Sequence, residues 1–136
     1  PVEETSLTIP STATKVITVG AYDARFDQAA AFSGRGYTRA TNQVKPDLVA
    51  PGVEIMSCAP GGGYQVRTGT SMATPFVTGS AALLMQWGIV NGNDAYLYGE
   101  KMKAYLIRGA RKLPGFTVYP NPVLGWGALC TADSIP

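Results

Sequence analysis

The chain has 136 residues, a length that fits one domain. Its residues are 46% hydrophobic and 15% charged, which is too apolar for an extended disordered tail. A net charge of +2 gives little electrostatic reason to expect a nucleic-acid or membrane-surface partner, and the sequence contains no histidine. This chain alone therefore supplies no imidazole base, no His-ligated metal and no pH switch near neutrality.

The ends of the chain and its cysteines bear on its cellular context. The chain begins at Pro1 rather than at methionine, so we expect a processed product or a cloned piece. We find no signal-peptide pattern and no apolar run of the roughly 20 residues that a spanning helix needs. Cys58 and Cys130 could form one bridge, but two ordinary buried thiols are expected.

The first half of the chain is predicted to form short strands separated by glycine and proline turns. Residues 15–22 (KVITVGAY) are rich in β-branched side chains, which indicates a strand buried on both faces. Phe32 and Ser33 are expected to form a second, short strand. Further strands are predicted at 47–50, 53–57 and 64–68.

The second half is predicted to be mainly helical. Residues 71–87 have apolar side chains on nearly every side of a helical wheel, which indicates a buried helix. A second helix, at 98–110, has one apolar stripe at spacings of three and four. We expect its basic residues to lie on a solvated face: Lys101, Lys103 and Arg108. Residues 114–122 are predicted to be a proline-rich loop, and 124–135 a final short element.

Residues 69–75 (GTSMATP) carry the main candidate for chemistry, because they lie where the strand-rich part meets the first helix. In the simpler interpretation a hydroxyl here only caps the helix. In the other, Ser71 is a nucleophile, and the amides and positive dipole end of the helix stabilise a developing oxyanion. Gly69 would then leave room for a substrate backbone.

The remaining candidate sites have plainer interpretations. Residues 61–63 with Arg67 lack the patterns of a phosphate-binding loop, and we expect a tight turn. The basic residues of 100–112 favour a solvated helix face over nucleic-acid binding. The carboxylates form no calcium loop and no metal cluster, so we predict no metal and no cofactor. Most of them are expected at the surface or in turns: Asp23, Asp27, Asp47, Glu54, Asp94 and Asp133.

The GTSMATP run resembles the nucleophile signature of the subtilases, the subtilisin-like serine proteases. Further stretches resemble motifs of that family in the same order: IPS and VITVGA within 9–21, AFS at 31–33, KPDLVAPG at 45–52 and LGWG at 124–127. Residues 99–103 and 121–130 are similar to clostridial subtilases related to spore-germination proteases. Phe76 departs from the pattern, since many subtilases have a non-catalytic histidine there.

This resemblance implies an α/β fold, a partial doubly wound and mainly parallel sheet whose central buried helix begins at the nucleophile. Residues 1–136 would be the C-terminal part of a single peptidase domain. Subtilases use an Asp, His and Ser triad with an oxyanion-hole Asn. Ser71 matches the nucleophile, and its N–H and the Thr70 hydroxyl would stabilise the oxyanion, whereas the Asp, His and Asn would precede Pro1.

The resemblance also bears on the loop that precedes the first predicted strand. It suggests a cis peptide bond at Ile9-Pro10. Carbonyl groups near Ser11, Ala13 and Val16 resemble the region of a weak cation site in some relatives, although we predict no metal.

Three hypotheses about function remain open. The parent protein would be a serine endopeptidase that cleaves protein or peptide substrates through an acyl-enzyme on Ser71, with the isolated chain inactive. Alternatively it is a pseudoprotease that binds without cleaving. In the third hypothesis the chain is a structural fragment whose bare sheet edge is covered by the N-terminal half of the domain or by a second copy. The family suggests a secreted or spore-associated protein.

Overall fold

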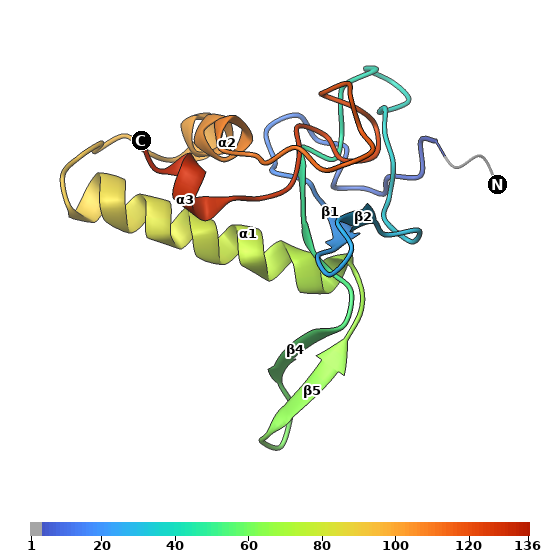
Figure 1. The fold of residues 1–136 in the computed structure, drawn as a ribbon. Coiled ribbons are helices and arrows are strands. Elements are labelled where there is room, and N and C mark those ends of the chain that lie inside the picture. Colours follow the sequence, from blue (N-terminus) through green and yellow to red (C-terminus); the bar gives the residue numbers. More distant parts are fainter. Residues whose placement is uncertain (1–3) are drawn as a thin grey trace.

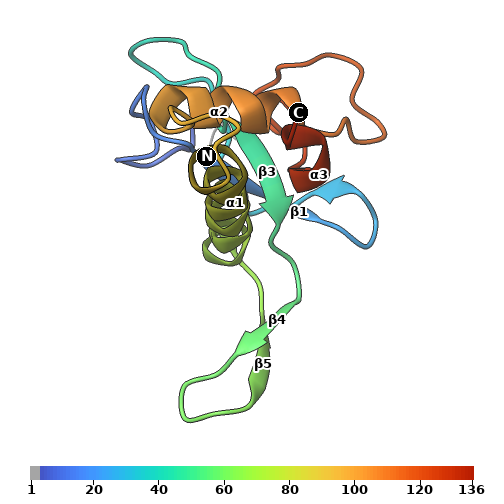
Figure 2. The same cartoon turned by 90° about the vertical axis from the view of Figure 1, so that its left-hand side faces the viewer.

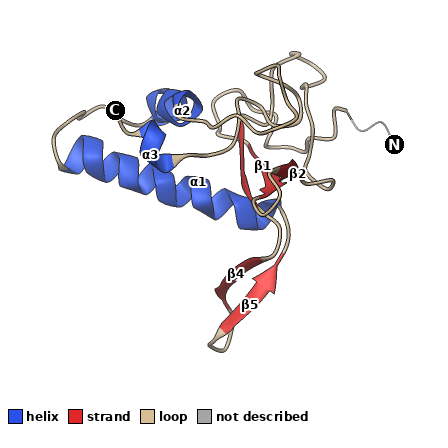
Figure 3. Cartoon of the chain, in the orientation of Figure 1, coloured by secondary structure: helices blue, strands red, loops and turns tan. Residues whose placement is uncertain are grey.

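A computed structural model describes residues 4–136 of the chain (Figure 1). The first half of the chain forms the strands and the second half forms the helices, which Figure 3 colours separately. In chain order they are β1 (Val19–Asp23), β2 (Gln28–Ala29), β3 (Leu48–Pro51), β4 (Ile55–Cys58), β5 (Tyr64–Arg67), α1 (Thr70–Met85), the π-helical segment η1 (Gln86–Val90), α2 (Gly99–Arg108) and α3 (Thr131–Ser134).

A small mixed sheet lies at the centre of the fold, with β1 as its middle strand. β1 pairs in parallel with β3 and antiparallel with the short β2. Ala128 adds a parallel bridge to Val49 of β3, so a third chain segment runs alongside the parallel pair. These parallel segments, covered by helices, confirm the predicted α/β class.

The strands β4 and β5 form a separate antiparallel hairpin, with Ile55 opposite Arg67 and Cys58 opposite Tyr64. The hairpin extends away from the sheet and the helices in both views (Figures 1 and 2). Its turn contains Gly61, Gly62 and Gly63, all with positive φ, which glycine adopts without steric cost. The expected tight turn at this position is therefore confirmed.

Two strand predictions need correction. β1 begins at Val19 rather than at residue 15, and Val16 is 39% exposed instead of buried. Just before β1 the N–H of Thr18 donates to the Asp47 carboxylate at 2.7 Å, while the Thr18 carbonyl accepts from the Asp47 N–H at 2.8 Å. Phe32 and Ser33 form no strand; the Ser33 hydroxyl instead accepts a hydrogen bond from the Ala21 N–H at 3.0 Å.

The prediction that the first helix is buried all round is wrong. α1 packs along β1 and β3 through one face, on which Ala73, Val77, Ser80 and Leu84 are buried. Its other sides are open to solvent, with Leu83 54% exposed and Phe76 and Met85 each 42% exposed. A helix with apolar residues on every side buries all of them only when neighbours cover every side, and the described residues cover one.

The later elements follow the predictions more closely. Met102 and Leu106 of α2 are buried, which confirms the apolar stripe. α3 packs against α2, within the stretch expected to form a final short element. The Ile9-Pro10 peptide bond is cis, as the resemblance suggested. Both cysteines are free, and Cys58 is exposed rather than buried.

The helical run Thr70–Val90 has 21 residues and, by length and composition alone, could cross a membrane. The expectation that no run in the chain is long enough is therefore wrong by this criterion. The core helix of a soluble protein meets the same criterion, and α1 packs against the sheet as such a helix does.

Candidate active site

Ser71 is the second residue of α1, at the end of the helix that meets the strand-rich half. Gly69 precedes the helix with φ 156°, and its N–H donates to the Gly52 carbonyl just after β3 at 2.8 Å. A Cβ on Gly52 would lie 2.6 Å from the Ala21 Cβ and 2.9 Å from the Gly69 carbonyl oxygen. A glycine at 52 thus allows the start of α1 to lie directly against the sheet.

The first turn of α1 leaves its amides available to a ligand. Within residues 4–136, the N–H groups of Thr70 and Ser71 make no backbone hydrogen bond, as expected at a helix N-terminus. The Ser71 side chain is exposed, and its hydroxyl has no hydrogen-bond partner in that same part of the chain. No side chain caps the helix, so the capping interpretation of these hydroxyls is wrong.

Two hollows flank Ser71. The first, which we call the hairpin hollow, measures about 510 Å³ and lies between α1 and the β4–β5 hairpin. The second, the loop hollow, measures about 570 Å³ and is formed mainly by residues 6–19 and the start of α1. Ser71 lines both hollows, so its hydroxyl stands between two spaces that can each receive part of a ligand.

These hollows contain few groups able to accept a proton. Arg67 and the Cys58 thiol are the titratable residues described in the hairpin hollow, and the loop hollow has none among its described lining residues. An arginine stays protonated and cannot act as a base in the working pH range. Because the chain has no histidine, it offers an exposed hydroxyl and free amides without an imidazole beside them.

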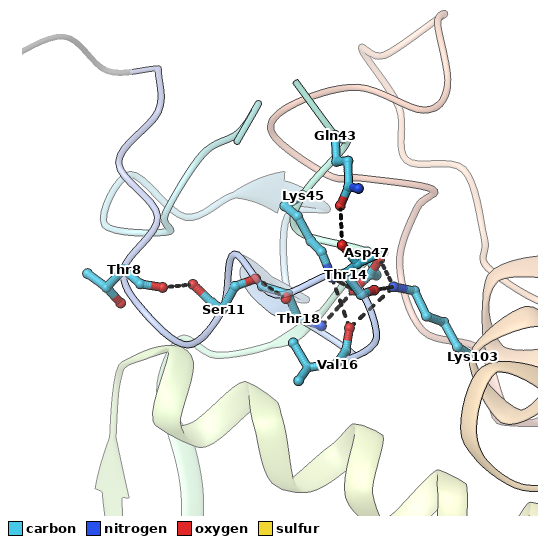
Figure 4. Close-up of polar contacts among 9 residues, drawn as sticks. All are labelled: Thr8, Ser11, Thr14, Val16, Thr18, Gln43, Lys45, Asp47 and Lys103. Carbon is cyan, nitrogen blue, oxygen red and sulfur yellow. Dashed lines mark hydrogen bonds and ion pairs between the residues drawn. The ribbon is translucent and has the colours of Figure 1, made fainter. Parts of the chain in front are cut away.

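A buried charge cluster holds the loop hollow's wall in place (Figure 4). Asp47, which comes just before β3, accepts from Lys45 Nζ at 2.7 Å and from Lys103 Nζ of α2 at 2.6 Å. Lys45 also donates to the Val16 carbonyl at 2.9 Å, and Lys103 to the carbonyls of Thr14 and Val16 at 3.1 and 3.2 Å. The cluster therefore ties β3, α2 and the loop before β1 together.

This cluster corrects two predictions. Asp47 is 3% exposed rather than at the surface, and Lys103 turns into the cluster instead of lying on a solvated face. Burial lowers the pKa of Lys45, while the hydrogen bond and charge of Asp47 oppose that shift. The Val16 carbonyl, which resembles part of a cation site in some relatives, accepts hydrogen bonds from two lysine ammonium groups.

Sequence reasoning missed this cluster, and it also missed the hairpin as a wall of the site. One available signal was the spacing of Lys45 and Asp47, since residues two apart in an extended segment lie on one face. Such spacing allows the two side chains to pair, and pairing is the condition under which Lys and Asp are found buried. Nothing local in the sequence pointed to Lys103, which is distant along the chain and meets Asp47 only in the fold.

Comparisons with known proteins agree with this geometry. A sequence profile of the subtilase family matches residues 2–127. Serine protease AprX of Bacillus subtilis is 35% identical over 147 aligned residues, covering 93% of this chain and 31% of AprX. An intracellular serine protease of Paenibacillus polymyxa is 46% identical over 77 residues, covering 57% of this chain and 21% of the relative.

Solved structures give the same result. The structure of the Clostridium perfringens CspB protease superposes with a TM-score of 0.92 at 46% identity, covering 96% of this chain and 28% of that one. Fold, motif order and sequence similarity together define an α/β serine-peptidase framework. The chain belongs to the subtilase family. Its similarity to a Clostridium protease confirms the clostridial part of the narrower resemblance. The chain spans about a third or less of the length of these relatives.

Proposed function

We propose that the protein carrying this chain is a serine endopeptidase and that Ser71 is its nucleophile. The observation that carries the proposal is the placement of Ser71, exposed at the start of α1 and lining two hollows. A peptide that crosses the helix end could place one side chain in each hollow, with its scissile carbonyl over the hydroxyl. The names of the relatives, which include serine proteases, support the same reaction class.

In the proposed reaction the Ser71 Oγ forms a bond to the carbonyl carbon of the substrate, and its proton passes to a general base. The carbonyl oxygen becomes an oxyanion that accepts hydrogen bonds from the Ser71 N–H and the Thr70 hydroxyl. Collapse of the tetrahedral intermediate breaks the C–N bond, and the amine leaves with a proton. Water then hydrolyses the acyl-enzyme and restores the serine, while Gly69 keeps the approach of the substrate backbone free.

The base and its carboxylate partner would come from a segment preceding this chain, since the chain itself has no histidine. We propose that the same segment packs on the exposed face of α1, where Leu83, Phe76 and Met85 are open. In the isolated chain a second copy would cover part of that face. The isolated chain is accordingly expected to be inactive, with no cofactor, metal, nucleic acid or membrane as partner.

The proposal is tested by measuring peptide hydrolysis by the full-length protein and by its Ser71→Ala variant. We expect the substitution to lower kcat by at least about 10³-fold without changing the fold, because the acyl-enzyme cannot form. Thr117→Ala, at an exposed position of the loop 114–122 and away from α1, serves as the control and should leave kcat unchanged. A full-length protein that binds peptides without cleaving them would support the pseudoprotease alternative instead.

We propose a secreted or spore-associated location, which rests on the family resemblance. One relative is named an intracellular protease, so the cell compartment needs its own test. Fractionation of the source cells should place the protein in the medium or the spore fraction. Recovery from the cytosol of growing cells would contradict this location.

A further inference from the structure

The two hollows beside Ser71 differ in charge. The loop hollow is lined by uncharged residues within the described part of the chain. The hairpin hollow is lined mostly by apolar side chains, among them Ile55, Met56 and Phe76, and by one charged group, the guanidinium of Arg67. A ligand that spans Ser71 therefore meets a cation on one side of the hydroxyl and none on the other.

The Arg67 guanidinium has no acidic partner among residues 4–136. Its neighbour Gln65 provides a neutral contact: with the amide oxygen facing Arg67, that oxygen accepts from Nε at 2.9 Å and from Nη2 at 3.1 Å. Glu54 comes just before the residue that pairs with Arg67, but its carboxylate is engaged by Arg25. Arg67 thus keeps donors available for an anion in the hollow.

We propose that the hairpin hollow binds a carboxylate of the substrate through Arg67, and that the substrate group in the loop hollow is uncharged. This inference rests on the proposed peptidase function and adds the substrate class. A guanidinium presents several donors in a plane and binds carboxylates more strongly than a neutral group would. The carboxylate is either the side chain of Asp or Glu near the scissile bond or the C-terminal carboxylate of a short peptide.

The size of the preference follows from the exposure of Arg67. The guanidinium lies on an exposed hairpin, where solvent screening keeps the contribution of an ion pair small. Replacing Glu by Lys at the same substrate position removes an attraction to Arg67 and adds a repulsion of similar size, so the two contributions add. We therefore expect kcat/KM to differ by roughly tenfold between such substrates.

The test uses the full-length protein and a peptide series with Glu, Gln or Lys at each of the two positions on either side of the scissile bond. We expect kcat/KM to be roughly tenfold higher for Glu than for Lys on one side of the bond, and to be independent of charge on the other side. Arg67→Glu should reverse the order, and Arg67→Gln should abolish it. Arg39→Glu makes the same charge change in a different hollow, lined by residues 5–12 and 37–41, and should leave the preference intact.

Two further arms separate the possible outcomes. Amidation of the C-terminus leaves kcat/KM unchanged if a side-chain carboxylate is bound, and lowers it if the terminal carboxylate is bound. The inference would be overturned, with the peptidase function left intact, if the wild-type protein cleaved the Glu, Gln and Lys peptides and their amidated forms equally. It would also be overturned if the preference survived Arg67→Glu. If no peptide is cleaved and Ser71 is inert, the proposed function itself fails.

Discussion

The Asp47 carboxylate, whose side chain is 5% exposed, forms ion pairs with the ammonium groups of both Lys45 and Lys103. The Lys45 side chain is itself only 2% exposed, so removal of the anion would leave a buried ammonium facing another cation. Losing one partner of a buried ion pair is costly, because the remaining charge stays desolvated. The cluster therefore makes the fold depend on this one carboxylate.

We predict that Asp47→Asn lowers the free energy of unfolding by about 3 kcal/mol or more. Urea denaturation of the purified protein, followed by tryptophan fluorescence, measures the change. Asp133→Asn changes an exposed carboxylate in α3 and should cost about 0.5 kcal/mol or less. Equal effects of the two substitutions would show that the cluster contributes little to stability.

Among the elements, α1 depends on its close contact with the end of β3. The Gly69 N–H reaches the Gly52 carbonyl, and a Cβ at 52 would clash with the Ala21 Cβ and the Gly69 carbonyl oxygen. Both obstacles belong to packed backbone or core atoms, which cannot move without shifting the helix. The position of Ser71 is therefore set by a glycine outside the helix.

Gly52→Ala is predicted to destabilise the protein by about 1–3 kcal/mol and to lower the reactivity of Ser71, since the helix end must move. Thermal unfolding and hydrolysis by the full-length protein measure the two effects. Gly79→Ala is the matched control, because a Cβ there meets nothing within 4 Å inside α1. In the isolated chain it should stabilise the helix by roughly 0.5–1 kcal/mol. Gly79 is the control for stability only, because it lies on the face of α1 that the preceding segment is proposed to cover. Activity at the wild-type level in Gly52→Ala would refute the packing argument.

The loop before α2 is attached to that helix by charge. Asp94 accepts from Lys101 Nζ at 2.6 Å and from the Tyr105 hydroxyl at 3.2 Å. The hydrogen bond from Lys101 is the main cause that holds the pKa of Asp94 below its ordinary value of 3.8. A carboxyl whose pKa is lowered on folding stabilises the folded state above its unfolded pKa and loses that effect as pH falls through the folded one.

We expect the attachment of α2 to weaken below pH 3.8 in the wild-type protein. Hydrogen exchange of the α2 amides, measured between pH 5 and 2.5 and corrected for the intrinsic rate, reports this opening. Asp94→Asn should remove this part of the pH dependence and should already show weaker α2 protection at pH 5. An unchanged acid response in the variant would assign the effect to other carboxylates.

Element by element, periodicity predicted the helices better than the strands. The spacing of Met102 and Leu106 is enough to place the buried stripe of α2. The start of β1 was not predictable from Val16 and its neighbours, because the Thr18 N–H bonds to the side chain of Asp47, which is distant in sequence. Ser71 is a candidate nucleophile from its motif alone, whereas Arg67 became a candidate only when the hairpin placed it beside α1.

In the molecule as a whole, burial is uneven. The sheet residues Leu48, Val49 and Ala50 are fully covered, while Phe76 and Leu83, which lie seven residues apart on one side of α1, remain open. A contiguous exposed apolar face marks an interaction surface. The sequence predicted the apolar character of α1 correctly, but it could not show that residues 4–136 cover only one side of it.

We predict that the isolated chain self-associates through this face. Light scattering with dilution should show an average mass above that of one chain, and Leu83→Lys should shift it toward the monomer. Val118→Lys changes an exposed apolar residue in a loop and should have no effect. A well-folded wild-type monomer at high concentration would contradict the assignment of this face to an interface.

The most direct test of the central claim is the site of labelling by a fluorophosphonate probe, determined by mass spectrometry. We expect the full-length protein to be modified at Ser71, and neither its Ser71→Ala variant nor the isolated 136-residue chain to be modified. That pattern would assign the nucleophile to this chain and the activating base to the rest of the protein. Labelling at another residue, or none in a folded full-length protein, would contradict the assignment of Ser71.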